Sequence, residues 1–253
     1  MRAHGRGSDW LPSGSAHPSS TERTAGAIPY GFKRTVHSSH AAVLDVLPRE
    51  GHGRKVLDLG CSNGYLGAEL ALRGYQVVGV EKAGGYGQAF PKELRLVEHD
   101  LELGVPESAG DCYDYVVCAD ILEHLRHPGE LLSTIPKILK ADGKLIASLP
   151  NSGHAYFRWS VLRGRFPQED RGLFDRTHLR FYMWDGWVRL FAEAGFEIQV
   201  ARPTSVPVGI AFPVLPPVLV HSLEALSVGL ARIWKTLFAY QFVVVAVRSN
   251  RSQ

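Results

Sequence analysis

The sequence predicts an α/β fold with a seven-stranded, mostly parallel sheet that carries helices on both faces. Two observations predict it. Short β-branched runs alternate with segments whose apolar residues recur every three or four positions, which is the pattern of strands and helices in turn. The first strand, helix and strand lie within residues 55–80 and form a βαβ unit, whose two strands pair in parallel. A chain of 253 residues is long enough for one such domain.

Each element follows from its own residues. The strands are expected at residues 55–59, 76–80, 94–98, 113–118, 144–149, 196–200 and 242–247, and the helices at 36–47, 65–73, 128–139 and 184–194. Gly74 and Gly195 each follow a helix, as helix-ending glycines do, and Asp142-Gly143 is expected to form the turn after the third helix.

Composition narrows the class of partner. The chain has 28 Lys and Arg against 25 Asp and Glu, and this excess is too small to favour nucleic acid as the main partner. The chain has three cysteines, an odd number without metal-binding spacing: Cys61, Cys112 and Cys118. This pattern fits a reducing, cytoplasmic environment. Residues 1–27 are rich in Gly, Ser and Arg and lack the apolar core of a secretory signal, so they are expected to be a disordered tail before a domain at 28–253.

Residues 206–240 are unusually apolar for a connection between two strands. Four prolines interrupt the first part, and leucines at helical spacing fill the second. A transmembrane helix needs about 20 uninterrupted apolar residues, which this segment does not supply. We expect a lid or substrate-pocket helix here, while core packing, a dimer face and an interfacial membrane helix stay open as alternatives.

A glycine-rich turn, VLDLGCSNG at residues 56–64, follows the first strand and precedes a helix. Gly60 and Gly64 let the backbone approach a ligand, and the helix N-terminus favours an anion such as a carboxylate. Nicotinamide enzymes use related turns. Asp58 is the discriminating residue, because a carboxylate there repels a pyrophosphate but accepts hydrogen bonds from an ammonium group.

Two further carboxylates follow strands in the expected order. Glu81 comes after the second strand, where an acidic side chain can accept hydrogen bonds from both hydroxyls of a ribose. Asp100 comes after the third strand, where a carboxylate can accept a hydrogen bond from an adenine amino group. The three carboxylates together favour a cationic nucleoside ligand over a dinucleotide.

These motifs resemble the class I methyltransferase superfamily, through VLDLGCSNG, the acidic end of GVE, Asp100 and the strand YDYVVCADILEHL. The resemblance covers about residues 30–201 and implies a Rossmann-like fold, S-adenosyl-L-methionine as cofactor and further cofactor contacts at Cys61, Leu101 and Ala119. It extends to a subgroup of bacterial small-molecule methyltransferases, of ubiquinone, polysaccharide and natural-product type, through the segment LPNSGHAYFRWSVLRGRFPQEDRGLFDRTHLRFY.

The resemblance implies an O-methyltransferase of a hydroxylated small molecule, which could be sugar-containing, lipid-linked, anionic or amphiphilic. N- or C-methylation of a natural product and a non-catalytic cofactor-binding protein are the alternatives. No nucleic-acid partner and no transmembrane segment are expected, and peripheral membrane contact stays open.

Three histidines are candidates for the base that removes a hydroxyl proton, because the imidazole pKa lies near neutrality. His124 follows the fourth strand, His154 follows the fifth, and His178 lies in the run Asp-Arg-Thr-His. Asp120, Glu123 and His124 also form a D-x-x-E-H run that resembles the E-x-x-E-H metal site of ubiquinone-type methyltransferases. A divalent ion is therefore an alternative, although Asp replaces the first Glu.

The segment at about 151–182 is expected to be a substrate-covering insertion, as is the segment at 206–240. Six arginines crowd it and could bind phosphate or carboxylate, or form a solvated face. They are Arg158, Arg163, Arg165, Arg171, Arg176 and Arg180. The interleaved aromatic residues could bind a ring, but their density favours core packing.

The tail expectation has a direct test. Deletion of residues 1–26 is expected to change the melting temperature by less than about 2 °C, because the tail lacks apolar residues that could pack on the domain. Differential scanning calorimetry of the full and shortened chains checks this, and a larger loss would show that the tail packs.

Overall fold

The computed structural model describes residues 39–86, 90–206, 208–211 and 214–250. Seven strands form one sheet in the order β3-β2-β1-β4-β5-β7-β6. The predicted α/β fold with a mostly parallel sheet is therefore confirmed. The expected tail at 1–27 and the first residues of the expected helix at 36–47 lie outside the described residues.

The sheet is parallel from β3 to β5, and β7 runs antiparallel to both of its neighbours. The strands are β1 Lys55–Leu59, β2 Gln76–Glu81, β3 Arg95–Glu98, β4 Tyr113–Ala119, β5 Leu139–Pro150, β6 Phe196–Pro203 and β7 Gln241–Arg248. Four of the five residues of β1 and four of the seven of β4 are buried, as expected for strands that are covered on both faces.

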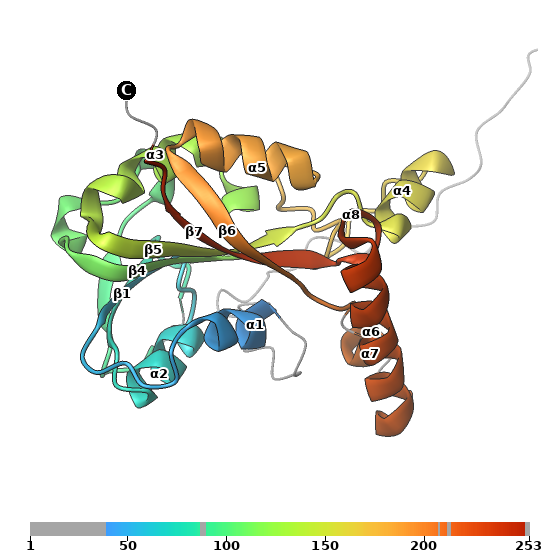
Figure 1. Ribbon diagram of the computed structural model, residues 1–253, viewed down its shortest axis with the longest axis horizontal. Helices are drawn as coiled ribbons and strands as arrows, with labels where there is room; N and C mark the ends of the chain where they lie inside the picture. Colours follow the sequence, from blue (N-terminus) through green and yellow to red (C-terminus); the bar gives the residue numbers. More distant parts are fainter. Residues whose placement is uncertain (1–38, 87–89, 207, 212–213, 251–253) are drawn as a thin grey trace, which may run out of the picture.

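Helices cover the two faces of the sheet in separate layers (Figure 1). Helices α1 Ser39–Val46 and α2 Tyr65–Leu72 pack on one face, and α3 Pro128–Ile138 and α5 Trp184–Glu193 pack on the other. Helix α5 buries Trp187 and Phe191, which lie four residues apart and therefore on one side of the helix.

The remaining helices lie beyond one end of the sheet (Figure 1). They are α4 Ala155–Leu162, α6 Val208–Ala211, α7 Pro217–Ile233 and α8 Lys235–Phe238. The two expected insertions meet there. The side-chain amide of Asn151 donates hydrogen bonds to the backbone carbonyls of Thr236 and Ala239 at 3.2 and 2.8 Å. None of the described helices is long and apolar enough to cross a membrane.

Several element boundaries differ from the sequence expectations. Strand β5 begins at Leu139 rather than at residue 144, because Leu139 pairs with Tyr113 before an irregularity brings Lys144 opposite Tyr115. The expected Asp142-Gly143 turn is this irregularity within the strand. Strand β6 continues to Pro203 instead of residue 200, because its residues stay paired with β7 up to the pair Pro203–Phe242.

Two helices were also misjudged from periodicity. Helix α4 was not expected, since its small separate core of Phe157, Leu173 and Phe174 draws on distant residues. The leucines of the second part of residues 206–240 predicted a helix, and α7 forms there but ends at Ile233, where Trp234 leaves helical dihedrals with φ −138° and ψ 79°. Helix α8 follows as a separate turn.

Trp187 connects α5 to the end of β5. Its side chain is fully buried, and its indole Nε1 donates a hydrogen bond to the Pro150 carbonyl at 2.9 Å. Trp187→Phe is expected to lower the free energy of unfolding by about 2–4 kcal/mol, because it removes packed atoms and leaves that carbonyl without its donor. Urea denaturation measures this loss.

The same substitution at the exposed Trp159 is the control and should cost less than about 0.5 kcal/mol. Equal denaturation midpoints for the two variants would contradict the assigned role of Trp187.

Candidate functional site

The carboxyl ends of the parallel strands bring most of the candidate residues to one edge of the sheet. The glycine turn follows β1, Glu81 ends β2, and Asp100 follows β3. Ala119 ends β4 and His154 follows β5 by four residues. Ligands of open α/β sheets bind outside this edge.

The glycine turn folds across the end of β2. The amides of Gly60 and Cys61 donate to the Val80 carbonyl at 2.9 and 3.2 Å. Gly60 has φ +75°, and a Cβ there would lie 2.7 Å from the Ile121 side chain. Gly64 has φ +71° and directly precedes α2. Both positions therefore require glycine, and the turn touches the segment that follows β4.

Asp58 is buried in β1, and its Oδ2 has no hydrogen-bond partner among the described residues. Burial, and secondarily the charge of Glu81, raises the pKa of Asp58 to about 7. Glu81 accepts hydrogen bonds from the Ser62 and Lys82 amides at 2.9 and 3.0 Å. A cationic ligand would relieve the repulsion between these carboxylates, and an ammonium donor would pair the orphaned oxygen.

The other expected cofactor residues have different local roles. Asp100 caps the short helix η1 Leu101–Leu103 by accepting a hydrogen bond from the Glu102 amide at 3.0 Å, so one of its oxygens has a structural role. The Leu101 side chain is buried. The Cys61 thiol lies against Gly79 of β2, and burial raises the pKa of this thiol. A thiolate nucleophile is therefore not favoured at Cys61.

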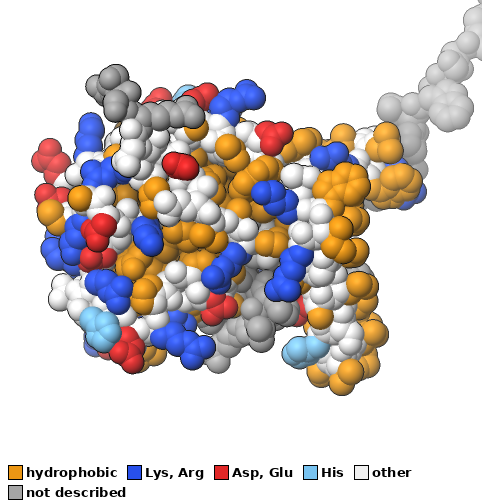
Figure 2. Space-filling model, viewed as in Figure 1, with side chains coloured by type: hydrophobic (Ala, Val, Ile, Leu, Met, Phe, Trp, Pro, Cys, Tyr) orange, Lys and Arg blue, Asp and Glu red, His pale blue; other side chains and the backbone are white. Residues whose placement is uncertain are grey.

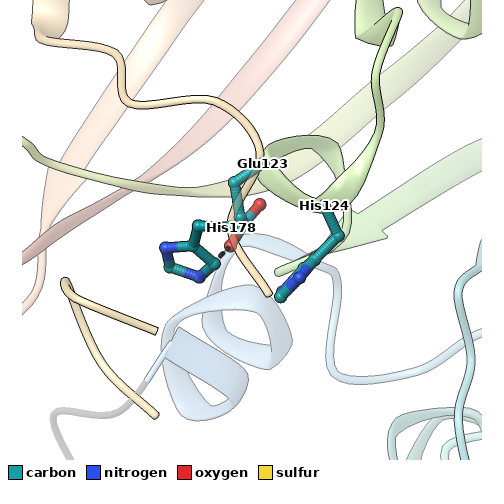
Figure 3. A group of neighbouring side chains, drawn as sticks. All are labelled: Glu123, His124 and His178. Carbon is teal, nitrogen blue, oxygen red and sulfur yellow. Dashed lines mark ion pairs between the residues drawn. The ribbon is translucent and has the colours of Figure 1, made fainter. Parts of the chain in front are cut away.

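Glu123, His124 and His178 form a cluster in which their ligand atoms lie within 4.8 Å of one another. Figure 3 shows Glu123 and His178 pointing toward each other, with the His124 ring beside them. His178 Nε2 lies 3.9 Å from Glu123 Oε1, and both side chains are buried. Backbone amides of Leu179 and Arg180 donate to the Glu123 carbonyl, which holds the 175–180 segment against η3 Leu122–His124.

Hydrogen bonding sets the tautomer of His124. Its Nδ1 lies 3.2 Å from the Thr177 carbonyl and 3.1 Å from Thr177 Oγ1. A carbonyl only accepts, and the Thr177 hydroxyl donates to Asp175 Oδ1 at 2.6 Å, so Nδ1 must carry the proton. Nε2 is then the basic nitrogen. Burial lowers the pKa of His124, so the ring is neutral at physiological pH.

Asp175 and Thr177 belong to the candidate site through these hydrogen bonds, although the sequence motifs did not indicate them. Asp175 also accepts from the Thr177 amide at 2.8 Å, which is the local turn that an Asp-x-Thr sequence favours. That spacing was the available signal, but only the fold brings the turn to His124.

His154 has the opposite tautomer. It caps α4, and its Nδ1 accepts a hydrogen bond from the Tyr156 amide at 3.2 Å, which leaves the proton of the neutral ring on Nε2. Burial lowers the pKa of His154 to about 4. The ring lines a cavity of about 230 Å³ between the two insertions. The other lining residues are Val206, Leu223, Leu226, Ser227, Leu230 and Phe238.

The expected metal set needs one correction. His178, rather than Asp120, joins Glu123 and His124 in the cluster found among the described residues. Asp120 instead accepts hydrogen bonds from Ser148 and Gln241 on Oδ1 and from Ser39 on Oδ2. This network turns the Asp120 carboxylate toward α1 and the end of β7, because Asp120 adopts φ +54° directly after β4.

The arginines and aromatic residues of 151–182 are used largely within the segment. Arg176 pairs with Asp170 at 2.6 Å, Arg158 donates to the Gly153 carbonyl, and Arg180 donates to the Arg126 carbonyl. Phe157 and Phe174 stack at 4.5 Å in the core beneath α4. Core packing therefore accounts for Phe157 and Phe174, whereas Tyr156, Trp159, Phe166 and Phe181 are exposed.

Comparison with known proteins gives the family from the sequence. The methyltransferase domain family matches residues 33–200. The ubiquinone biosynthesis O-methyltransferase of Chromobacterium violaceum is 31% identical over 182 residues, which cover 66% of this chain and 75% of that protein. Matches to other bacterial proteins of this name reach 50–66% of their length, so the chain spans between half and two thirds of those relatives.

Solved structures share the fold at lower identity. The S-adenosylmethionine dependent methyltransferase from Mesorhizobium loti has a TM-score of 0.55 and 18% identity, over 83% of this chain and 98% of that one. Magnesium protoporphyrin IX methyltransferase from Synechocystis, solved with bound SAH, has a TM-score of 0.54 and 20% identity, over 85% and 82% of the two chains. The chain therefore belongs to the class I, S-adenosylmethionine-dependent methyltransferase family.

Proposed function

We propose that this enzyme transfers a methyl group from S-adenosylmethionine to a hydroxyl oxygen of a small molecule. The observation that carries the proposal is His124, which lies in the cluster with Glu123 and His178 and whose Nδ1 is bonded to Thr177, so that Nε2 is the basic nitrogen. Ile121, three residues earlier, packs against Gly60 of the glycine turn. The cluster is thus next to the cofactor turn, and the O-methyltransferase relatives support an oxygen acceptor.

Asp58 and Glu81 are proposed to hold the cofactor's ammonium group and ribose hydroxyls, respectively. When bound, the cofactor supplies an electrophilic methyl group. Methyl transfer is an in-line displacement, so the chain must align the acceptor, exclude water and remove the hydroxyl proton. His124 Nε2 is assigned to the proton, and His178 and Glu123 line the same space.

Glu123, His124 and His178 also suit a divalent cation, because one carboxylate and two imidazoles are ordinary ligands of such ions. A bound ion would supply positive charge that lowers the pKa of the acceptor hydroxyl. Calorimetric titration with Zn²⁺ or Mg²⁺, compared between the wild type and His178→Ala, separates the two ways of activating the hydroxyl.

The atom that receives the methyl group can be identified by nuclear magnetic resonance. Cofactor labelled with ¹³C in its methyl group, incubated with a panel of hydroxylated metabolites, is expected to give products whose methyl carbon has the chemical shift of an O-methyl group. N-methyl or C-methyl products would establish the alternative reaction. An absence of turnover with retained cofactor binding would favour a non-catalytic binding protein.

Asp58→Asn tests the cofactor assignment. It is expected to weaken S-adenosylmethionine binding by roughly ten- to a hundredfold, because a charge-assisted hydrogen bond contributes about 1.5–3 kcal/mol. The cofactor-free variant is expected to be more stable than the wild type at pH 8. Since the folded-state pKa of Asp58 is raised from 3.8 to about 7, ionisation costs the wild type stability as the pH rises through that window.

Isothermal titration calorimetry and urea denaturation at pH 5 and pH 8 measure the two effects. Asp111→Asn, at an exposed position, is the matched control and should change neither quantity. Unchanged cofactor affinity in Asp58→Asn, or a wild type that binds NAD instead, would refute the assignment.

His124→Gln tests the base. Turnover is expected to fall by roughly a hundredfold or more while cofactor affinity stays near that of the wild type. In the wild type, kcat/KM should fall only on the acid side, with a midpoint below 6.5, because burial lowers the pKa of His124 and the base works when deprotonated.

His154→Gln is the matched histidine control, and it should keep most of the turnover, since Nε2 of His154 carries a proton. If His154→Gln lost turnover and His124→Gln kept it, the base would be assigned to the wrong histidine.

A further inference from the structure

Helix α7 exposes apolar residues and buries its only acidic one. Glu224 is 3% exposed, whereas Leu226 is 59% and Ile233 is 85% exposed. Leu219, Leu223, Leu226, Leu230 and Ile233 recur every three or four residues and therefore form one stripe along the helix. A helix that packs on a protein core in the ordinary way would turn this stripe inward. The stripe is thus left exposed on the described chain, with Leu223, Leu226 and Leu230 at the edge of the cavity that His154 also lines.

Helix α4 has the same character. Its exposed apolar side chains, with that of the following Phe166, are Tyr156, Trp159, Val161, Leu162 and Phe166. The Arg163 guanidinium lies 5.6 Å from the centre of the Trp159 ring. Tryptophan and arginine side by side at an exposed apolar site are typical of protein segments at a membrane interface.

The two helices belong to one surface. His154 at the start of α4 lines the same cavity as Leu223, Leu226 and Leu230 of α7. Figure 2 shows hydrophobic side chains gathered over this end of the molecule, where Figure 1 places α4, α7 and α8. We call the exposed side chains of residues 155–168 and 214–238 the apolar end surface.

The charges of the apolar end surface are positive, and acidic side chains begin at its border, where Tyr156 Oη donates a hydrogen bond to Glu169 at 3.4 Å. Its exposed charged residues are Arg158, Arg163, Arg165, Arg232 and Lys235, and the single acidic residue of both ranges is the buried Glu224. A two-fold contact with a second copy would bring these positive charges together. An anionic lipid surface instead accepts apolar side chains in its acyl region and basic side chains at its phosphates.

We propose that the apolar end surface binds an anionic lipid bilayer peripherally, with the leucine stripe of α7 and the exposed side chains of α4 entering the interface. The proposal concerns a surface of the chain and does not depend on which atom the enzyme methylates.

Vesicle flotation tests the proposal with the full chain. The wild type should float with vesicles of phosphatidylcholine and phosphatidylglycerol at low ionic strength, and only weakly with vesicles of phosphatidylcholine alone. The double variant Leu162→Glu/Ile233→Glu should bind the anionic vesicles roughly 20-fold or more weakly, because each charge alone contributes about fivefold at such a surface. Arg163→Gln/Arg165→Gln should lose a similar factor.

Leu72→Glu/Leu103→Glu is the matched control, since both leucines are as exposed as the tested pair but lie on α2 and η1. It should float like the wild type, and circular dichroism should show all variants folded. Failure of the wild type to bind anionic vesicles, or equal binding by the tested and control pairs, would overturn the proposal. The proposal would also be overturned if the wild type were a dimer and Leu162→Glu/Ile233→Glu were a monomer, because a second copy of the chain would then cover the surface.

Discussion

The parallel pairing of β1 with β2 and β4 is the constraint on which the rest of the site depends. It brings the ends of three buried strands to one edge, so that the glycine turn, Glu81 and the segment after β4 become neighbours. Contact between Gly60 and Ile121 then couples the cofactor turn to the histidine cluster. The same burial leaves Asp58 with an orphaned oxygen and a raised pKa, which a cationic ligand would correct.

Backbone groups decide what each histidine can do. A carbonyl accepts from Nδ1 of His124 and so leaves Nε2 basic, whereas an amide donates to Nδ1 of His154 and so places the proton on Nε2. Both rings are partly or fully buried, and burial lowers the pKa of both. Burial alone therefore does not distinguish the two rings, because the hydrogen-bond partner sets which ring nitrogen carries the proton.

The two insertions add a second surface to the methyltransferase domain. They contact each other through Asn151, and together they leave an apolar, basic end beside the cavity at His154. Helix α7 contributes little to the core of the sheet, since Glu224 and Ala231 are its only side chains that are fully buried among those described. Its exposed leucines are the basis of the proposed lipid-binding surface.

Local sequence pattern alone determined the order of strands and helices along the chain, the glycine turn and the three carboxylates at or near the ends of strands. Periodicity and turn chemistry are encoded within a few residues, so they can be recognised without the fold. It also marked His124, His154 and His178 as candidates. Only the tertiary structure decided that His178 replaces Asp120 beside Glu123 and His124, that β5 starts at Leu139, and that Glu224 points inward while the leucines of α7 point outward. These outcomes depend on contacts between residues tens of positions apart, and spacing within one segment carries no information about them.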